Sequence, residues 1–200
     1  YDVLGVDFIG SNGLLYFQNS GNMILNSDTS IGVQMTASGR VGIVNTDSGK
    51  IEVRGDNSYG IYLNSGNLSG SYTLTASNID PSINFSNIFI QAGSIETYGD
   101  NNYGVVVNGN VTLASGISLN DGSISVYGAD STGIYQDRNN NFQNNGQIEI
   151  SGDNGNGIRV DQGTITNANS ASIIIQGSDN SSGMASTNLN ALSKIINNGS

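Results

Sequence analysis

The sequence predicts an all-β protein, a right-handed parallel β-helix with three short strands and about 22 to 29 residues per turn. Three observations predict this solenoid. A glycine-bracketed pattern recurs along the chain, and the apolar residues inside each copy alternate with a period of two. In addition, Gly or Asn interrupts every window that is long enough for a helix. A β-sandwich remains the alternative fold, since alternation alone also suits its strands.

The recurring pattern reads G-x-I-x-[VIT]-x-G-x4-G-[IV]-x-[VL]. Six copies are recognised, the first and last of them looser: 31–45, 49–63, 93–107, 122–136, 146–160 and 171–186. The glycine after the first strand recurs at intervals of 44, 29, 24 and 25 residues, at Gly55, Gly99, Gly128, Gly152 and Gly177. We interpret the interval of 44 residues as two turns of the solenoid, one of them degenerate.

Each copy supplies two strands, and a short apolar patch before the next copy supplies the third. In the first strand of one copy, Ile148 and Ile150 are expected to point inward while Glu149 and Ser151 point outward. An Asn-Asn-Gly turn at 144–146 closes the preceding turn. The alternation therefore predicts two inward stacks: Ile51, Ile95, Ile124, Ile148 and Ile173 in one, and Ile61, Val105, Ile134 and Ile158 in the other.

We expect the 200 residues to form one solenoid that is part of a longer protein. It would divide into irregular turns over 1–48, regular turns over 49–186 with a degenerate unit at 64–92, and a truncated turn over 187–200.

The composition excludes several classes of function. The chain has no Cys and no His, which excludes disulfides, thiol nucleophiles and catalytic triads that use His. Six basic against sixteen acidic residues give a net charge of −10, which argues against binding nucleic acid. We therefore expect no cofactor and no metal, and carboxylate catalysis is the enzymatic chemistry left open.

The rung signatures I-x-N-x-G-x-I and G-x4-G-I, together with the Gly/Asn/Ser richness and the absence of Cys, resemble those of passenger domains of Gram-negative (type V) autotransporter adhesins. This resemblance implies a protein at the bacterial outer-membrane surface or secreted, attached through a C-terminal membrane barrel outside this chain. It also implies adhesion to a host or bacterial surface protein or glycan. Some members of the family carry a serine protease or lipase module, but we expect this chain to be a monomer without enzymatic activity. No G-x-S-x-G nucleophile motif is present.

Two outward columns of the repeat carry the candidate ligand-binding residues. One column holds Arg54, Tyr98, Tyr127 and Ser151, and the other holds Tyr62, Val106, Tyr135 and Arg159. Exposed Tyr and Arg side chains are frequent binding anchors. Stacked rings along a sheet also stabilise it, which is the alternative role of both columns. A further candidate is Phe85, in the degenerate unit that contains the only proline.

Acidic residues form two further sets in the repeat. Asp56, Asp100 and Asp153 follow the first turn glycine, and we expect them to make structural Asx turns, because one carboxylate per turn gives too few ligands for calcium. Glu52, Glu96 and Glu149 share an outward column. With two turns between neighbours they would lie about 10 Å apart, too far for a retaining glycosidase and marginal for an inverting one.

These observations favour an adhesive segment of a surface-displayed rod, which binds its partner through an outer face or a projecting loop. One alternative is a polysaccharide lyase or hydrolase with a β-helix fold, although the six cations are too scattered for a cleft that binds acidic sugars. The other alternative is a spacer rod whose parent protein binds elsewhere.

Overall fold

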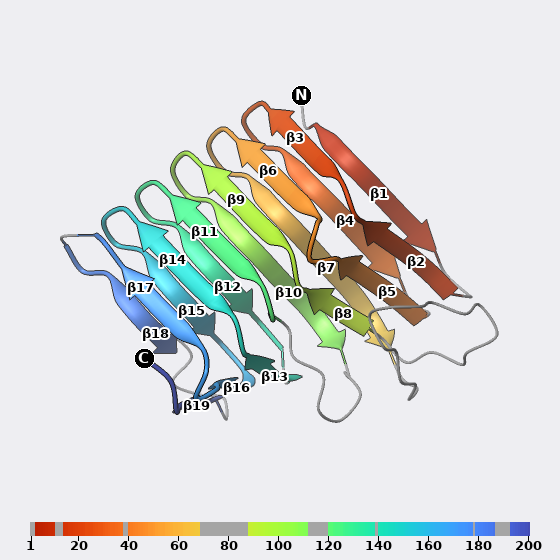
Figure 1. Ribbon diagram of the computed structural model, residues 1–200. Helices are drawn as coiled ribbons and strands as arrows, with labels where there is room; N and C mark the ends of the chain where they lie inside the picture. The colour runs from red at the N-terminus through yellow and green to blue at the C-terminus, as the bar shows by residue number, and fades with distance from the viewer. Residues whose placement is uncertain are drawn as a thin grey trace.

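A computed structural model describes residues 3–10, 14–37, 40–68, 88–111, 120–138, 140–177, 179–186 and 193–200. This described part is a parallel β-solenoid, which confirms the predicted architecture (Figure 1). It contains strands and turns and no helix, and hence no helix that could cross a membrane. The right-handed sense of the coil stays a prediction.

Up to three strands follow one another in a turn and join three different faces of the solenoid. In one turn, the described part of the third face is Asn120 alone, which bridges to Gln91 and Asn144 in the neighbouring turns. The seven-stranded sheet contains, in spatial order, β1 (Leu4–Gly10), β4 (Ile31–Ala37), β7 (Tyr59–Leu68), β10 (Tyr103–Val111), β12 (Thr132–Gln136), β15 (Asn156–Val160) and β18 (Ser182–Ser186). The six-stranded sheet contains β3 (Asn22–Asn26), β6 (Lys50–Arg54), β9 (Ser94–Tyr98), β11 (Ser123–Tyr127), β14 (Gln147–Ser151) and β17 (Ser172–Ile175). The third face is made of β2 (Leu14–Asn19), β5 (Arg40–Asn45) and β8 (Ile88–Gln91), and of β13 (Asn140–Asn144), β16 (Gly163–Asn167) and β19 (Ser193–Asn197).

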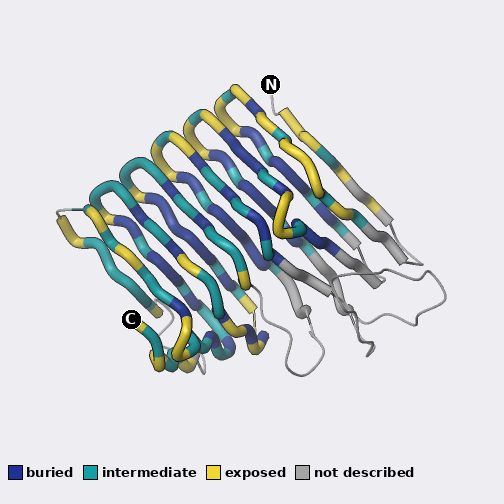
Figure 2. The backbone as a smooth tube through the Cα atoms, in the orientation of Figure 1, coloured by how far each residue is buried: buried dark blue, intermediate teal, exposed yellow. Residues whose placement is uncertain are grey.

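The core contains the two predicted aliphatic stacks, together with further inward residues such as Val53, Ile150 and Phe142. Register pairs join Ile51 to Ile95, Ile95 to Ile124, and so on to Ile173, and these side chains are fully buried except Ile173, which packs against the core from its edge. The stack that begins at Ile61 is fully buried throughout. Buried residues accordingly run as continuous bands through the stacked strands, while the turns along one edge are largely exposed (Figure 2).

A glycine opposite each isoleucine explains the Gly-[Ile/Val] step of the repeat. A Cβ on Gly104 would lie 2.3 Å from Cγ2 of Ile124 on the facing sheet. The same holds at Gly60, where a Cβ would lie 2.4 Å from Cγ2 of Ile95. Side chains of the six-stranded sheet therefore fill space that the glycines of the seven-stranded sheet leave open.

Amide side chains fill the corner where the third face turns into the six-stranded sheet. Buried Asn144 accepts a hydrogen bond from Asn120 at 2.8 Å and donates one to Asn167 at 2.7 Å. Asn45 likewise donates to Gln91 of the next turn at 2.8 Å. This amide ladder satisfies buried polar groups and ties successive turns together. The sequence indicated turns at these positions but not the ladder.

The interval of 44 residues is one turn of the solenoid, so its interpretation as two turns was wrong. β6 pairs directly with β9, which places Ile51 beside Ile95, and β7 pairs directly with β10. Most of the extra length falls between β7 and β8, where 69–87 lie outside the described residues. Glu52 and Glu96 are consequently neighbours on adjacent strands, about 4.8 Å apart along the stack rather than about 10 Å.

Candidate binding surface

The outer face of the six-stranded sheet carries the first predicted column, which we call the open ladder: Arg54, Tyr98, Tyr127 and Ser151. Register pairs join these residues in that order across β6, β9, β11 and β14. The rings of Tyr98 and Tyr127 stack with centroids 4.8 Å apart and planes 14° from parallel. Arg54 places its guanidinium carbon 6.0 Å from the centroid of the Tyr98 ring. The column is thus confirmed as a ladder, and its role in binding stays a prediction.

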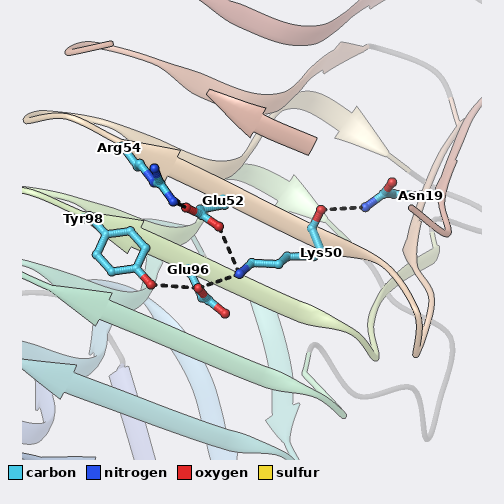
Figure 3. Close-up of polar contacts among 6 residues, drawn as sticks. All are labelled: Asn19, Lys50, Glu52, Arg54, Glu96 and Tyr98. Carbon is cyan, nitrogen blue, oxygen red and sulfur yellow. Dashed lines mark hydrogen bonds and ion pairs between the residues drawn. The ribbon is translucent and has the colours of Figure 1, made fainter. Parts of the chain in front are cut away.

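A chain of ion pairs lies beside the open ladder (Figure 3). The Lys50 ammonium contacts Glu52 at 3.0 Å and Glu96 at 2.9 Å, so that one cation bridges two adjacent strands. Arg54 forms a further ion pair with Glu52, and the Tyr98 hydroxyl donates to Glu96 at 2.8 Å. Glu52 was expected to be an exposed outward residue, but Lys50 and Arg54 cover it and its side chain is 5% exposed.

These contacts set the protonation of the group. The hydrogen bond from Lys50 lowers the pKa of Glu52, and the bonds to Glu96 and Glu52 raise the pKa of Lys50. Partial burial and the bond to Glu96 raise the pKa of Tyr98 to about 12. At neutral pH, Glu52 and Lys50 are therefore charged and the Tyr98 hydroxyl remains a donor. A glycosidase needs one carboxyl group held protonated beside a second, ionised one, and the lowered pKa of Glu52 works against the protonated role.

Four tyrosines gather on the seven-stranded sheet in what we call the closed cluster: Tyr59, Tyr62, Tyr103 and Tyr135. Tyr59 stacks on Tyr103 with centroids 5.4 Å apart, and the Tyr62 ring meets Tyr59 edge-on at 5.4 Å. The Tyr103 and Tyr135 centroids lie 6.0 Å apart. The second predicted column holds only Tyr62 and Tyr135 of these four, with Val106 between them in register.

The closed cluster uses its polar groups within the protein. Asn108 donates to the Tyr62 hydroxyl at 3.0 Å, and the Tyr135 hydroxyl donates to Asp161 at 2.8 Å. Arg159 lies over the Tyr135 ring with its guanidinium carbon 5.1 Å from the centroid. Burial, together with the bond to Asp161, raises the pKa of Tyr135.

Tyr59 and Tyr103 are site residues that the sequence did not reveal. Strict alternation back from inward-facing Ile61 would place Tyr59 inside the solenoid. Gly60 packs inward against Ile95 instead, which shifts the phase of the strand and brings Tyr59 to the outer side with Tyr62. The Tyr-Gly pair repeated at Tyr59 and Tyr103 was the signal available for finding them.

The acidic turns form a ladder of another kind. Asp56 accepts a hydrogen bond from the backbone N–H of Asp100 at 2.9 Å, and Asp100 accepts one from Ala129 at 2.8 Å. Asp153 accepts from Asp179 at 3.4 Å. Their carboxylates therefore link successive turns rather than closing their own turn, which corrects the expected Asx geometry. No group of three or more Asp or Glu side chains in the described residues is arranged to hold a metal.

Two other regions are candidates, and the prediction for one of them, Phe85, stays untested. Phe85 and the proline at position 81 lie outside the described residues. A shallow hollow of about 510 Å³ beside β13 and β16 is lined by uncharged residues without an aromatic ring: Gln143, Asn145, Thr166, Ala168, Asn169, Ser170 and Asn198. Of the two tyrosine groups described, the open ladder holds the more exposed ring, that of Tyr98, and ion-paired charges lie beside it.

Comparison with known proteins assigns no relative to this chain. No protein-family model, curated protein or solved structure matches it. The interpretation of the open ladder therefore rests on its own geometry.

Proposed function

We propose that this chain is an adhesive segment of a surface-displayed rod, similar to the passenger domains of autotransporter adhesins, and that the open ladder binds a surface protein or glycan. The observation that carries this proposal is the exposed ring of Tyr98, stacked on the partly buried ring of Tyr127. Tyr98 remains 36% exposed although its ring stacks on Tyr127 and its hydroxyl is bonded to Glu96. The implied location, the bacterial cell surface or the medium, is part of the same proposal.

Large rings on a polar background support a binding role. The outward neighbours of Tyr127 on its own strand are Ser123 and Ser125, which bury little apolar area. Aromatic rings bury far more area per residue and dominate the energetics of interfaces. Because the stack and the Arg54 contact already hold the two rings, binding would cost little further ordering of side chains.

The carboxylates beside the ladder support binding better than catalysis. Glu52 and Glu96 share the Lys50 ammonium, and Glu52 is ion-paired a second time by Arg54. Ion-paired carboxylates stay ionised and hold the surrounding side chains in place. For this reason we place recognition, rather than hydrolysis or elimination, at this face.

The test is retention of the purified chain on arrays of glycans and host receptors and on intact bacterial and host cells. We expect the wild type to bind, and the double variant Tyr98→Ala/Tyr127→Ala to bind at least tenfold more weakly, about 1.4 kcal/mol, with a melting temperature only a few degrees lower. Retention of the wild type on none of these surfaces would favour the spacer rod. Unchanged binding by the variant would place the site elsewhere on the chain.

A further inference from the structure

The open ladder changes from large to small side chains between Tyr127 and Ser151, and we call the surface at this point the step. The distance between the Tyr98 and Tyr127 rings equals the usual spacing of strands, so the ring faces point along the stack of turns. Arg54 stands next to the outer face of Tyr98. The corresponding face of Tyr127 looks toward Ser151, its register partner on β14. A serine side chain is too small to cover an aromatic ring, so one face of Tyr127 lacks a large neighbour in the ladder.

Polar groups line this step. The Ser151 hydroxyl donates to Oε1 of Gln176 at 3.2 Å, and Nε2 of Gln176 donates to Oε1 of Glu149 at 2.8 Å. Gln176 is exposed, and Ser151 and Glu149 are partly exposed. A ligand beside Tyr127 would therefore meet a hydroxyl, an amide and a carboxylate within two adjacent strands. The cations of this face, Lys50 and Arg54, lie at the other end of the ladder in ion pairs.

We infer that this step is the binding site for an uncharged hexopyranose unit of a glycan, an inference that rests on the function proposed above. The weakly positive C–H groups of a pyranose pack on the negative face of an aromatic ring, as other positive groups do. A sugar ring stacked on this face of Tyr127 would lie over Ser151, about one strand spacing from the aromatic ring. The sugar hydroxyls bond to the Ser151, Gln176 and Glu149 side chains.

The charges of the step decide between classes of sugar. An ionised carboxylate such as Glu149 accepts hydrogen bonds and cannot donate them, so it favours the hydroxyl groups of neutral sugars. The same charge repels uronic and sialic acids, whose carboxylates need a cation or several donors. The net charge of −10 adds to this repulsion. Uncharged glycans are therefore the class that fits.

The experiment fills the step without removing either tyrosine. Ser151→Tyr extends the ring stack by one residue and occupies the place of the sugar. By calorimetric titration with cellohexaose, maltohexaose and mannohexaose, we expect the wild type to bind at least one of them, and Ser151→Tyr to bind it at least about tenfold more weakly. Hexagalacturonate should bind to neither protein. Thr164→Tyr is the matched control, since it adds the same ring to β16 on another face and should bind as the wild type does.

A second variant covers the case in which Ser151→Tyr fails to fold. Glu149→Ala removes the carboxylate from a partly exposed position and leaves both rings in place, and it should also weaken binding of the neutral hexaose. Failure of the wild type to bind any of the three neutral hexaoses, or undiminished binding by a folded Ser151→Tyr or by Glu149→Ala, overturns this inference. Neither result affects the proposed adhesive function, which fails separately if the wild type is retained on none of the arrays or cells.

Discussion

The open ladder and the closed cluster are both built from tyrosines of the same repeat, but the rings differ in how completely other side chains surround them. In the closed cluster, four rings contact one another, the Tyr62 and Tyr135 hydroxyls are bonded to Asn108 and Asp161, and Arg159 covers an outer ring. In the open ladder, two rings stack and Arg54 lies at one end, but the other end meets only Ser151. A tyrosine column in a solenoid can therefore cover its sheet or remain available to a ligand, depending on what stands at its end.

The largest effect is expected where one substitution removes the scaffold of both tyrosine groups. Ile148 is fully buried between the sheets, and a Cβ on Gly133 of β12 would lie 2.6 Å from its Cγ2. Ile148→Asp places an unpaired charge in this core and should cost more than about 4 kcal/mol. Because each turn is stabilised by its neighbours, several turns should unfold together. Hydrogen exchange would show this as lost protection on both sides of β14, and loss confined to β14 would contradict it.

A smaller effect should separate the two tyrosine groups by stability. Tyr103 contacts two rings of the closed cluster and is partly buried, so Tyr103→Ala should lower the free energy of unfolding by about 2 kcal/mol. Tyr98→Ala removes one stacked ring and one hydrogen bond from an exposed position, and about 1 kcal/mol is expected. Urea denaturation of both variants measures the difference. Equal losses would mean that the open ladder stabilises the sheet as much as the closed cluster does.

Acid should act on the ion pairs beside the open ladder. The pKa of Glu52 in the folded protein lies below its ordinary value of 4.5, so this carboxylate stabilises the fold above that pH and the contribution is lost as the pH falls through the lowered pKa. Glu52→Gln should therefore melt at a lower temperature than the wild type at neutral pH. The difference in melting temperature between the two proteins should begin to shrink below about pH 4.5 and vanish once the pH is below the lowered pKa of Glu52.

Melting temperatures recorded across that pH range by circular dichroism test this expectation. Glu149→Gln is the matched control, because the carboxylate of Glu149 is bonded to an amide rather than ion-paired, and at neutral pH it should lower the melting temperature less than Glu52→Gln does. A difference between Glu52→Gln and the wild type that stays constant down to low pH would contradict the role given to Lys50 and Arg54.

The sequence predicted the parts of the fold that depend on periodicity. The alternation of Ile148 and Ile150 with Glu149 and Ser151 gave the correct inward and outward faces, and the repeat aligned Tyr98 with Tyr127. Both follow from local geometry, because a strand repeats every two residues and successive turns pair in register.

The parts that were wrong or missed depend on contacts that periodicity does not contain. The length between two copies does not say whether an extra turn or an insertion fills it, so Glu52 and Glu96 were placed two turns apart although they are paired neighbours. Strict alternation would have placed Tyr59 inside the solenoid. Because Gly60 faces inward, the alternation shifts by one residue and Tyr59 lies on the outer side. Glu52 is covered by the long side chains of Lys50 and Arg54. Alternation predicts which face of the strand a side chain leaves from, but not the direction in which a long side chain then bends.

The most direct measurement compares how much each of the two tyrosine groups contributes to binding and to stability. Tyr98→Ala/Tyr127→Ala and Tyr59→Ala/Tyr103→Ala are compared for melting temperature and for affinity toward whichever surface or glycan retains the wild type. We expect the first variant to lose at least about tenfold in affinity while its melting temperature falls by only a few degrees. The second variant should melt well below the wild type and, at temperatures where it is folded, bind as the wild type does. The reverse pattern, with affinity lost from the closed cluster and stability from the open ladder, would contradict the assignment of binding to Tyr98 and Tyr127.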